Sequence, residues 1–188
     1  MSEFVLVPSK SQIRLHTFAE GLFSKLAHDL ELRCIGLSGT ATREQGEHAS
    51  PGTAGTATLS VPLSGIEVTG TLHGARINFE GLSAGERREC IEKMRHDVFH
   101  TDESGVVRVE IALRNGTAQV RIVPPKGKTA EVSAKVNVRE ESNTVIGEGT
   151  LELSLMAIGS DVVKGPMNAF RVKDKVLVHF DVAFVSKN

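Results

Sequence analysis

The segments GTLELSLMAI at 149–158 and KVLVHFDVAFV at 175–185 decide the fold of this chain, because apolar and polar residues alternate along both. Such alternation predicts β-strands that bury one face and expose the other, as in antiparallel sheets covered on one side. The turn-rich stretch SDVVKGPMNAFRVKD at 160–174 joins the two predicted strands. Together they indicate a closed antiparallel barrel, whose interior is a place where a ligand can be held.

Further segments alternate in the same way, so the sequence predicts about ten strands in all. These segments are residues 12–19, 29–34, 56–61, 66–73, 76–80, 107–113, 117–122 and 130–138. Asn115-Gly116 separates two of them and is the strongest short signal for a hairpin. The turn at 124–127 closes the next hairpin, whereas 44–55 predict a polar, Gly-rich loop. Many strands joined by short turns predict a barrel or a sandwich, and a barrel is favoured because closure leaves no edge strand.

One helix is expected among the strands. Ser83 followed by Glu86 is a capping-box pattern. Ile91, Met94 and Val98 then recur at helical spacing. The sequence therefore predicts a helix over about 84–97 that covers apolar surface with one stripe.

Composition limits the classes of partner. The 188 residues fit a single domain, 1–188, that is long enough to bury a core. Because 22 Lys and Arg oppose 23 Asp and Glu, no overall field attracts nucleic acid or anionic lipid. Two small basic clusters, Arg87-Arg88 and Lys126 with Lys128, are expected to be solvated surface rather than a phosphate site. Aromatic residues interleaved with basic ones, as in single-strand binders, are missing from the sequence, so we expect no nucleic-acid partner.

The sequence also predicts a compartment and the state of the thiols. MSEFVLVPSKSQ at 1–12 has neither the basic nor the long apolar region of a secretory signal. No apolar run approaches the roughly 20 residues of a membrane helix. We therefore expect a cytoplasmic protein with no membrane-spanning segment and with Cys34 and Cys90 as free thiols. Cys34 alternates with apolar neighbours and is expected to be a small buried hydrophobe.

No catalytic motif stands out, so we expect neither enzymatic activity nor a cofactor. Ser24, His28 and Asp29 are residue types of a hydrolytic triad, but adjacent strand positions point to opposite faces. His96 and His100 have the spacing of two zinc ligands on one helix face; the alternative is a pair of surface histidines at a helix C-terminus. His28 follows a Gly-led stretch, where it either donates a hydrogen bond at a cavity mouth or bonds to the backbone.

Several segments carry a resemblance to a known family. They are Ser11 with Ile13, GLFSKLAHDLEL at 21–32, RRECIEKMRHDVF at 87–99, and the closing GTLELSLMAI and GPMNAFRVKDKVLVHFDVAF. In this order and spacing they resemble YceI-like proteins over almost the whole chain. The resemblance implies an extended lipocalin-like antiparallel barrel, closed in part by the short helix, with a polyisoprenoid such as a quinone precursor in an apolar channel. It implies no catalytic residues, and because the chain has no Trp and no Tyr, no ring-stacking contact with a headgroup is expected.

Our first hypothesis is a non-enzymatic carrier of a long apolar ligand, either a polyisoprenoid or an isoprenoid-quinone-like molecule. An apolar lining gains about 25 cal/mol for each Å² of ligand surface removed from water. The alternatives are a packed structural or protein-interaction domain without a cavity, and a His-based metal-binding protein. For assembly, a homodimer is the commonest default. The expected ligand-binding residues are Leu15, His28, Val68, Leu72, Ile77, Phe79, Met94 as a lid, Val109, Ile111, Leu153 and Phe180.

Overall fold

The protein is mainly β in the computed structural model, which describes residues 2–21, 27–44 and 54–187. Within these ranges lie fourteen strands and the helix α1 (Ala84–Lys93). The strands are β1 (Ser2–Leu6), β2 (Gln12–Thr17), β3 (Ala19–Glu20), β4 (Asp29–Cys34), β5 (Ser38–Arg43), β6 (Ala54–Pro62), β7 (Ile66–His73), β8 (Arg76–Asn78), β9 (Val106–Arg114), β10 (Thr117–Val123), β11 (Ala130–Glu141), β12 (Thr144–Ser154), β13 (Arg171–Val172) and β14 (Lys175–Ser186).

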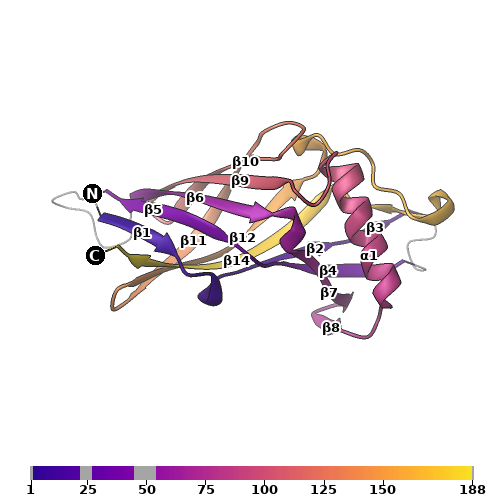
Figure 1. The fold of residues 1–188 in the computed structure, drawn as a ribbon, viewed down its shortest axis with the longest axis horizontal. Helices are drawn as coiled ribbons and strands as arrows, with labels where there is room; N and C mark the ends of the chain where they lie inside the picture. The colour runs from indigo at the N-terminus through magenta and orange to yellow at the C-terminus, as the bar shows by residue number, and fades with distance from the viewer. Residues whose placement is uncertain (1, 22–26, 45–53, 188) are drawn as a thin grey trace.

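Eight of these strands close into an antiparallel barrel, which confirms the predicted fold class (Figure 1). Around the barrel the order is β1-β5-β6-β9-β10-β11-β12-β14, and β14 pairs back to β1. Strand β14 has a third neighbour as well. It pairs with β2 along residues 177–181 and with β1 along residues 184–186. From β2 the sheet continues through β4, β7 and β8 beyond the barrel.

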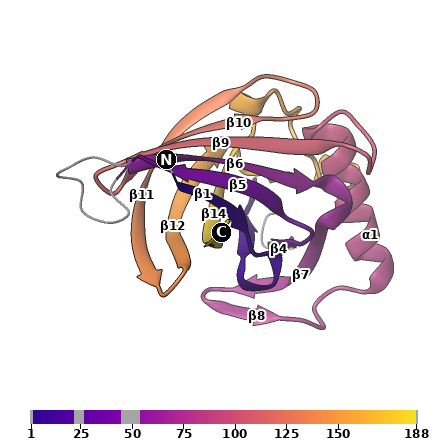
Figure 2. The same ribbon diagram turned by 60° about the vertical axis from the view of Figure 1, so that its left-hand side comes forward.

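The strands outside the barrel continue barrel strands across short breaks. The helical turn η1 (Pro8–Lys10) separates β1 from β2, and η3 (Leu63–Gly65) separates β6 from β7. Proline has no N–H for a sheet ladder, and Pro8 and Pro62 stand at these two breaks. Gly36, with φ of 71°, lies between β4 and β5. The extension formed by β2, β4, β7 and β8 thus lies at the end of the barrel near α1, and α1 contacts β7 (Figure 2).

The helix forms where the sequence predicts it. The Ser83 hydroxyl accepts a hydrogen bond from the Glu86 amide, and the Glu86 carboxylate accepts one from the Ser83 amide at 2.8 Å, which completes the capping box. A π-helical turn, η4 (Met94–Val98), extends α1 by one turn. Val98 is buried, so the predicted apolar stripe does end in the core.

The two predicted hairpins are confirmed. Asn115 and Gly116 connect β9 to β10 with φ of 50° and 72°, and positive φ at both positions is the requirement of a type I′ turn. Gly127, with φ of 110°, lies in the connection between β10 and β11. Of the predicted polar loop at 44–55, residues 45–53 lie outside the described part of the chain.

Arg87 corrects one expectation from the sequence. Its guanidinium is not a solvated surface charge, because Nη1 donates to the backbone carbonyls of Val68 at 2.6 Å and Thr69 at 3.0 Å. Nε of the same side chain donates to the Leu82 carbonyl at 3.2 Å. Arg87 therefore ties α1 to strand β7, whereas the neighbouring Arg88 is exposed as expected.

Candidate ligand cavity

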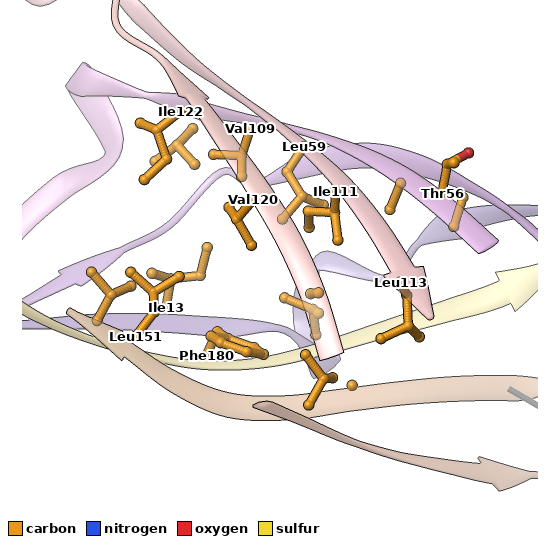
Figure 3. A pocket seen from close by; sticks show the side chains of 18 of the residues that line it. Ile13, Thr56, Leu59, Val109, Ile111, Leu113, Val120, Ile122, Leu151 and Phe180 are labelled. Carbon is orange, nitrogen blue, oxygen red and sulfur yellow. The ribbon is translucent and has the colours of Figure 1, made fainter. Parts of the chain in front are cut away.

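An apolar cavity of about 240 Å³ lies inside the barrel. Antiparallel barrel strands point every second residue inward, so the lining follows the alternation of the sequence. Figure 3 shows Ile111 and Leu113 from β9, Val120 from β10 and Phe180 from β14 around the same space. The cavity exceeds the roughly 150 Å³ of an apolar protein cavity that is known to hold benzene.

One end of the cavity, near η4, is closed. Phe99, directly after η4, and Ile158 line it there. The Ile158 carbonyl accepts a hydrogen bond from the Lys128 amide at 2.9 Å, which joins this segment to the connection between β10 and β11. His100 Nε2 lies 2.9 Å from the Gly159 carbonyl oxygen and ties the same segment to the end of η4. Backbone hydrogen bonds and two large apolar side chains therefore hold this end shut.

The other end of the cavity carries the charged residue of the lining. Arg43 from the end of β5 lines it, opposite Gly55 of β6. The neighbouring Thr42 and Thr56 alternate with these inward positions, and their hydroxyls contact each other in an exposed position at 2.8 Å. Among the described lining residues, Arg43 is the one with a charge. Its side chain is 27% exposed, so this end reaches solvent. From Val107 to Leu113 on β9, the cavity extends about 20 Å at the rise of a β-strand.

Cys34 is a wall residue of this cavity and confirms the expected buried thiol. Both cysteines are free in the structure, as predicted. Burial raises the pKa of the Cys34 thiol from 9.0 to about 12, because the thiolate loses its hydration in the apolar wall. Burial also raises the pKa of Cys90, and the carboxylates of Glu89 and Glu86 raise it further. At neutral pH both thiols are protonated, which disfavours nucleophilic or redox chemistry here.

The raised pKa predicts how the stability of the fold depends on pH. Above pH 9.0 the Cys34 thiol ionises in the unfolded chain but stays protonated in the folded chain up to about pH 12. The folded protein then binds more protons, so the free energy of unfolding falls as the pH rises through this range. Urea denaturation at about pH 8 and about pH 10.5 should show wild type losing some 1–2 kcal/mol more than Cys34→Ala. An equal loss in both proteins would contradict the prediction.

The structure brings together some of the residues expected to bind a ligand. Those in the cavity lining are Leu15, Val109, Ile111, Leu153 and Phe180. Those outside the lining are Val68 and Leu72, buried in the sheet extension, Ile77 and Met94, half-buried, and His28 and Phe79, exposed. Phe79 is 64% exposed. For all of them, a role in ligand binding stays a prediction.

Other lining residues were not singled out from the sequence. Phe99 takes the place at the closed end that was expected for Met94, and a signal for it exists, because Phe99 directly follows the apolar stripe of the helix. Leu113 ends the alternation that contains Val109 and Ile111. No alternation or helical spacing in the sequence indicated Arg43 as a lining residue, because it directly precedes the predicted loop at 44–55.

The histidine and serine candidates do not form a common site. His96 Nδ1 lies 2.9 Å from the Asp97 carboxylate, whereas His100 contacts the carbonyl of Gly159. Within 2–21, 27–44 and 54–187, no group of three or more His, Cys, Asp or Glu residues could hold a metal ion. Asp29 accepts a hydrogen bond from a backbone amide, and Ser24 lies outside the described residues.

Searches of known proteins extend the description of the fold. No family model matches the chain, and no curated protein sequence matches it. Among solved structures, the chain is similar to the crystal structure of BcnA from Burkholderia cenocepacia, with a TM-score of 0.62. The match covers 95% of this chain and 98% of BcnA at 13% sequence identity. At this identity the likeness shows a shared barrel fold, and a fold by itself does not define a function. None of the helices in the described ranges is long and apolar enough to cross a membrane.

Proposed function

We propose that this protein binds and carries a long apolar molecule of the polyisoprenoid kind inside its barrel, without catalysing a reaction on it. The observation that carries the proposal is the apolar cavity, in which one charged side chain, Arg43, stands among the described lining residues. Sites for small molecules are mostly apolar with a few polar groups that orient the ligand. The cavity has this composition, with the charged side chain of Arg43 at one end.

The shape of the cavity favours an elongated ligand. Its lining follows β9 from Val107 to Leu113, and Phe99 and Ile158 close one end. A chain-like molecule enters such a space with one end first and leaves its other end beside Arg43. At about 25 cal/mol per Å², apolar contact along the chain supplies the affinity. A packed domain without a cavity, which was the alternative from the sequence, offers no account of the space that this lining encloses.

We also propose that the chain belongs to the YceI-like family. The support is the ordered set of sequence segments that resemble this family, together with a mainly β barrel whose closed end is completed by residues after the predicted helix. Under this proposal the cavity corresponds to the apolar channel that the resemblance implies.

Native mass spectrometry of protein purified without detergent tests the carrier function. We expect an added mass that extraction with organic solvent removes, and we expect farnesol or geranylgeraniol added to the extracted protein to restore a complex of one ligand per barrel. Circular dichroism before and after extraction controls for loss of the fold. Protein that carries no added mass and takes up neither prenol would overturn the proposed function.

A further inference from the structure

Arg43 occupies a particular place on the barrel wall. It pairs with Gly55 in the β5–β6 ladder, as Ala41 pairs with Ala57, and all four residues line the cavity. Arg43 thus extends an inward-facing row of small residues to the rim. Its guanidinium carbon lies 5.2 Å from the centre of the Phe4 ring, a cation–π distance that holds the charge over the apolar opening.

The partner of Arg43 comes from the opposite wall. Its Nη2 donates to the carboxylate of Glu140, which lies near the end of β11. In the barrel order, three strands separate β5 from β11 on one side (β6, β9 and β10) and three on the other (β1, β14 and β12). Glu140 stands two residues after Val138 and four after Val136, both of which line the cavity. The ion pair therefore spans the open end of the barrel.

This ion pair is easy to replace. The two side chains are 27% and 32% exposed, and ion pairs in contact with solvent contribute roughly 0–1 kcal/mol. Within the described part of the chain, Nη2 is the one nitrogen of this guanidinium that donates to a protein group. A guanidinium is built to bind a carboxylate or a phosphate through two parallel hydrogen bonds, and Glu140 receives one.

We propose that the ligand of this cavity is an amphiphile with an acidic headgroup, a carboxylate or a phosphate, and that Arg43 binds this headgroup at the rim in place of Glu140. The inference rests on the proposed function and adds the chemical class and the orientation of the ligand. The apolar chain points toward Phe99 and Ile158, and the acid stays at the solvent end. A cationic headgroup is disfavoured because Arg43, and not Glu140, lines the cavity.

Competition against a bound fluorescent apolar probe, N-phenylnaphthylamine, measures this preference. The competitors are dodecanoic acid, dodecyl phosphate, dodecan-1-ol and dodecylamine, which share one chain and differ in the headgroup. For wild type we expect the better of the two acids to bind about tenfold or more tightly than the alcohol, since hydrogen bonds to charged groups are the strong ones. The acid that gains more identifies the headgroup as carboxylate or phosphate.

Variants separate the role of Arg43 from general charge effects. Arg43→Met keeps the apolar stem and should bring the acids to the affinity of the alcohol, and Arg43→Lys should retain part of the preference. Glu140→Gln should raise acid affinity by about two- to fivefold, because it removes the competing carboxylate. Arg139→Met is the matched control. Arg139 precedes Glu140 on β11 and forms an exposed ion pair with Glu148 on the outside of the barrel, so its substitution should leave all affinities unchanged.

The outcomes distinguish the two levels of the proposal. Equal binding of acids and alcohol to wild type, tighter binding of the amine, or an acid preference that survives in Arg43→Met would each overturn the acidic headgroup and leave the carrier function standing. Failure of all four competitors to bind would overturn the carrier function and the headgroup together.

Discussion

Gly147→Leu is expected to lower the affinity of the barrel for a twelve-carbon amphiphile by about a hundredfold or more while the protein stays folded. Gly147 lines the cavity from β12. A Cβ atom at this position would lie 3.5 Å from Val136 and 3.9 Å from Val182, which is ordinary van der Waals contact. The rest of a leucine side chain then occupies space that the ligand needs. Its burial adds about 1.5–3 kcal/mol of favourable transfer free energy, so the free energy of unfolding should not fall.

Two substitutions on the same strand make this result specific. Glu152→Leu adds the same side chain at an exposed position whose ion pair with Lys175 lies in solvent, and it should bind ligand like wild type. Gly149→Leu should instead destabilise the fold by about 1–3 kcal/mol. A Cβ at Gly149 would meet the Lys135 carbonyl oxygen at 2.5 Å and the Phe180 ring at 2.7 Å. Probe displacement combined with urea denaturation checks all three, and normal binding by folded Gly147→Leu would contradict a ligand inside the barrel.

Arg87→Met is expected to lower the free energy of unfolding by about 3 kcal/mol, because each hydrogen bond from a charged donor contributes roughly 1.5–3 kcal/mol. Between Glu31 and Leu32 the register of the β4–β7 ladder shifts, and Thr69 of β7 has no partner on β4. On its other side, β7 pairs with β8 along residues 71–73. Arg87 donates to the carbonyls of Val68 and Thr69 at this irregularity in the ladder, where buried carbonyl groups need hydrogen-bond partners.

Arg88→Met is the matched control for this change, because Arg88 carries the same charge on the same helix and is exposed. It should alter the free energy of unfolding by less than about 0.5 kcal/mol. Urea denaturation measures both variants, and hydrogen exchange should show faster exchange at α1 and β7 in Arg87→Met. Similar small effects of the two substitutions would show that the carbonyl contacts of Arg87 do not hold α1 in place.

Elements governed by local chemistry could be predicted from the sequence. The Asn115-Gly116 turn has positive φ at both positions, and the capping box of Ser83 and Glu86 begins α1. Strand β5 was missed, because SGTATR at 38–43 consists of small and polar residues. Small residues are needed there, since a Cβ at Gly39 would lie 2.4 Å from the Thr58 carbonyl oxygen. Packing between neighbouring strands, rather than hydrophobicity, thus selects this strand.

The cavity and its charged rim depend on contacts that no local pattern contains. Alternation predicts which side chains share a face, but the same pattern describes a filled core and a hollow one. Small residues such as Ala57 and Gly147 at inward positions leave space inside the barrel. The order of the strands around the barrel decides which residues face them. Arg43 and Glu140 lie far apart in the sequence, and only the closure of eight strands places them across one opening.

Strand β14 has a further consequence for how the protein is made. On the ribosome, β1, β2 and β12 emerge before residues 175–186, yet each of them pairs with β14. The barrel therefore cannot close until β14 has been synthesised, and the apolar side chains that face the interior stay uncovered along that side until then.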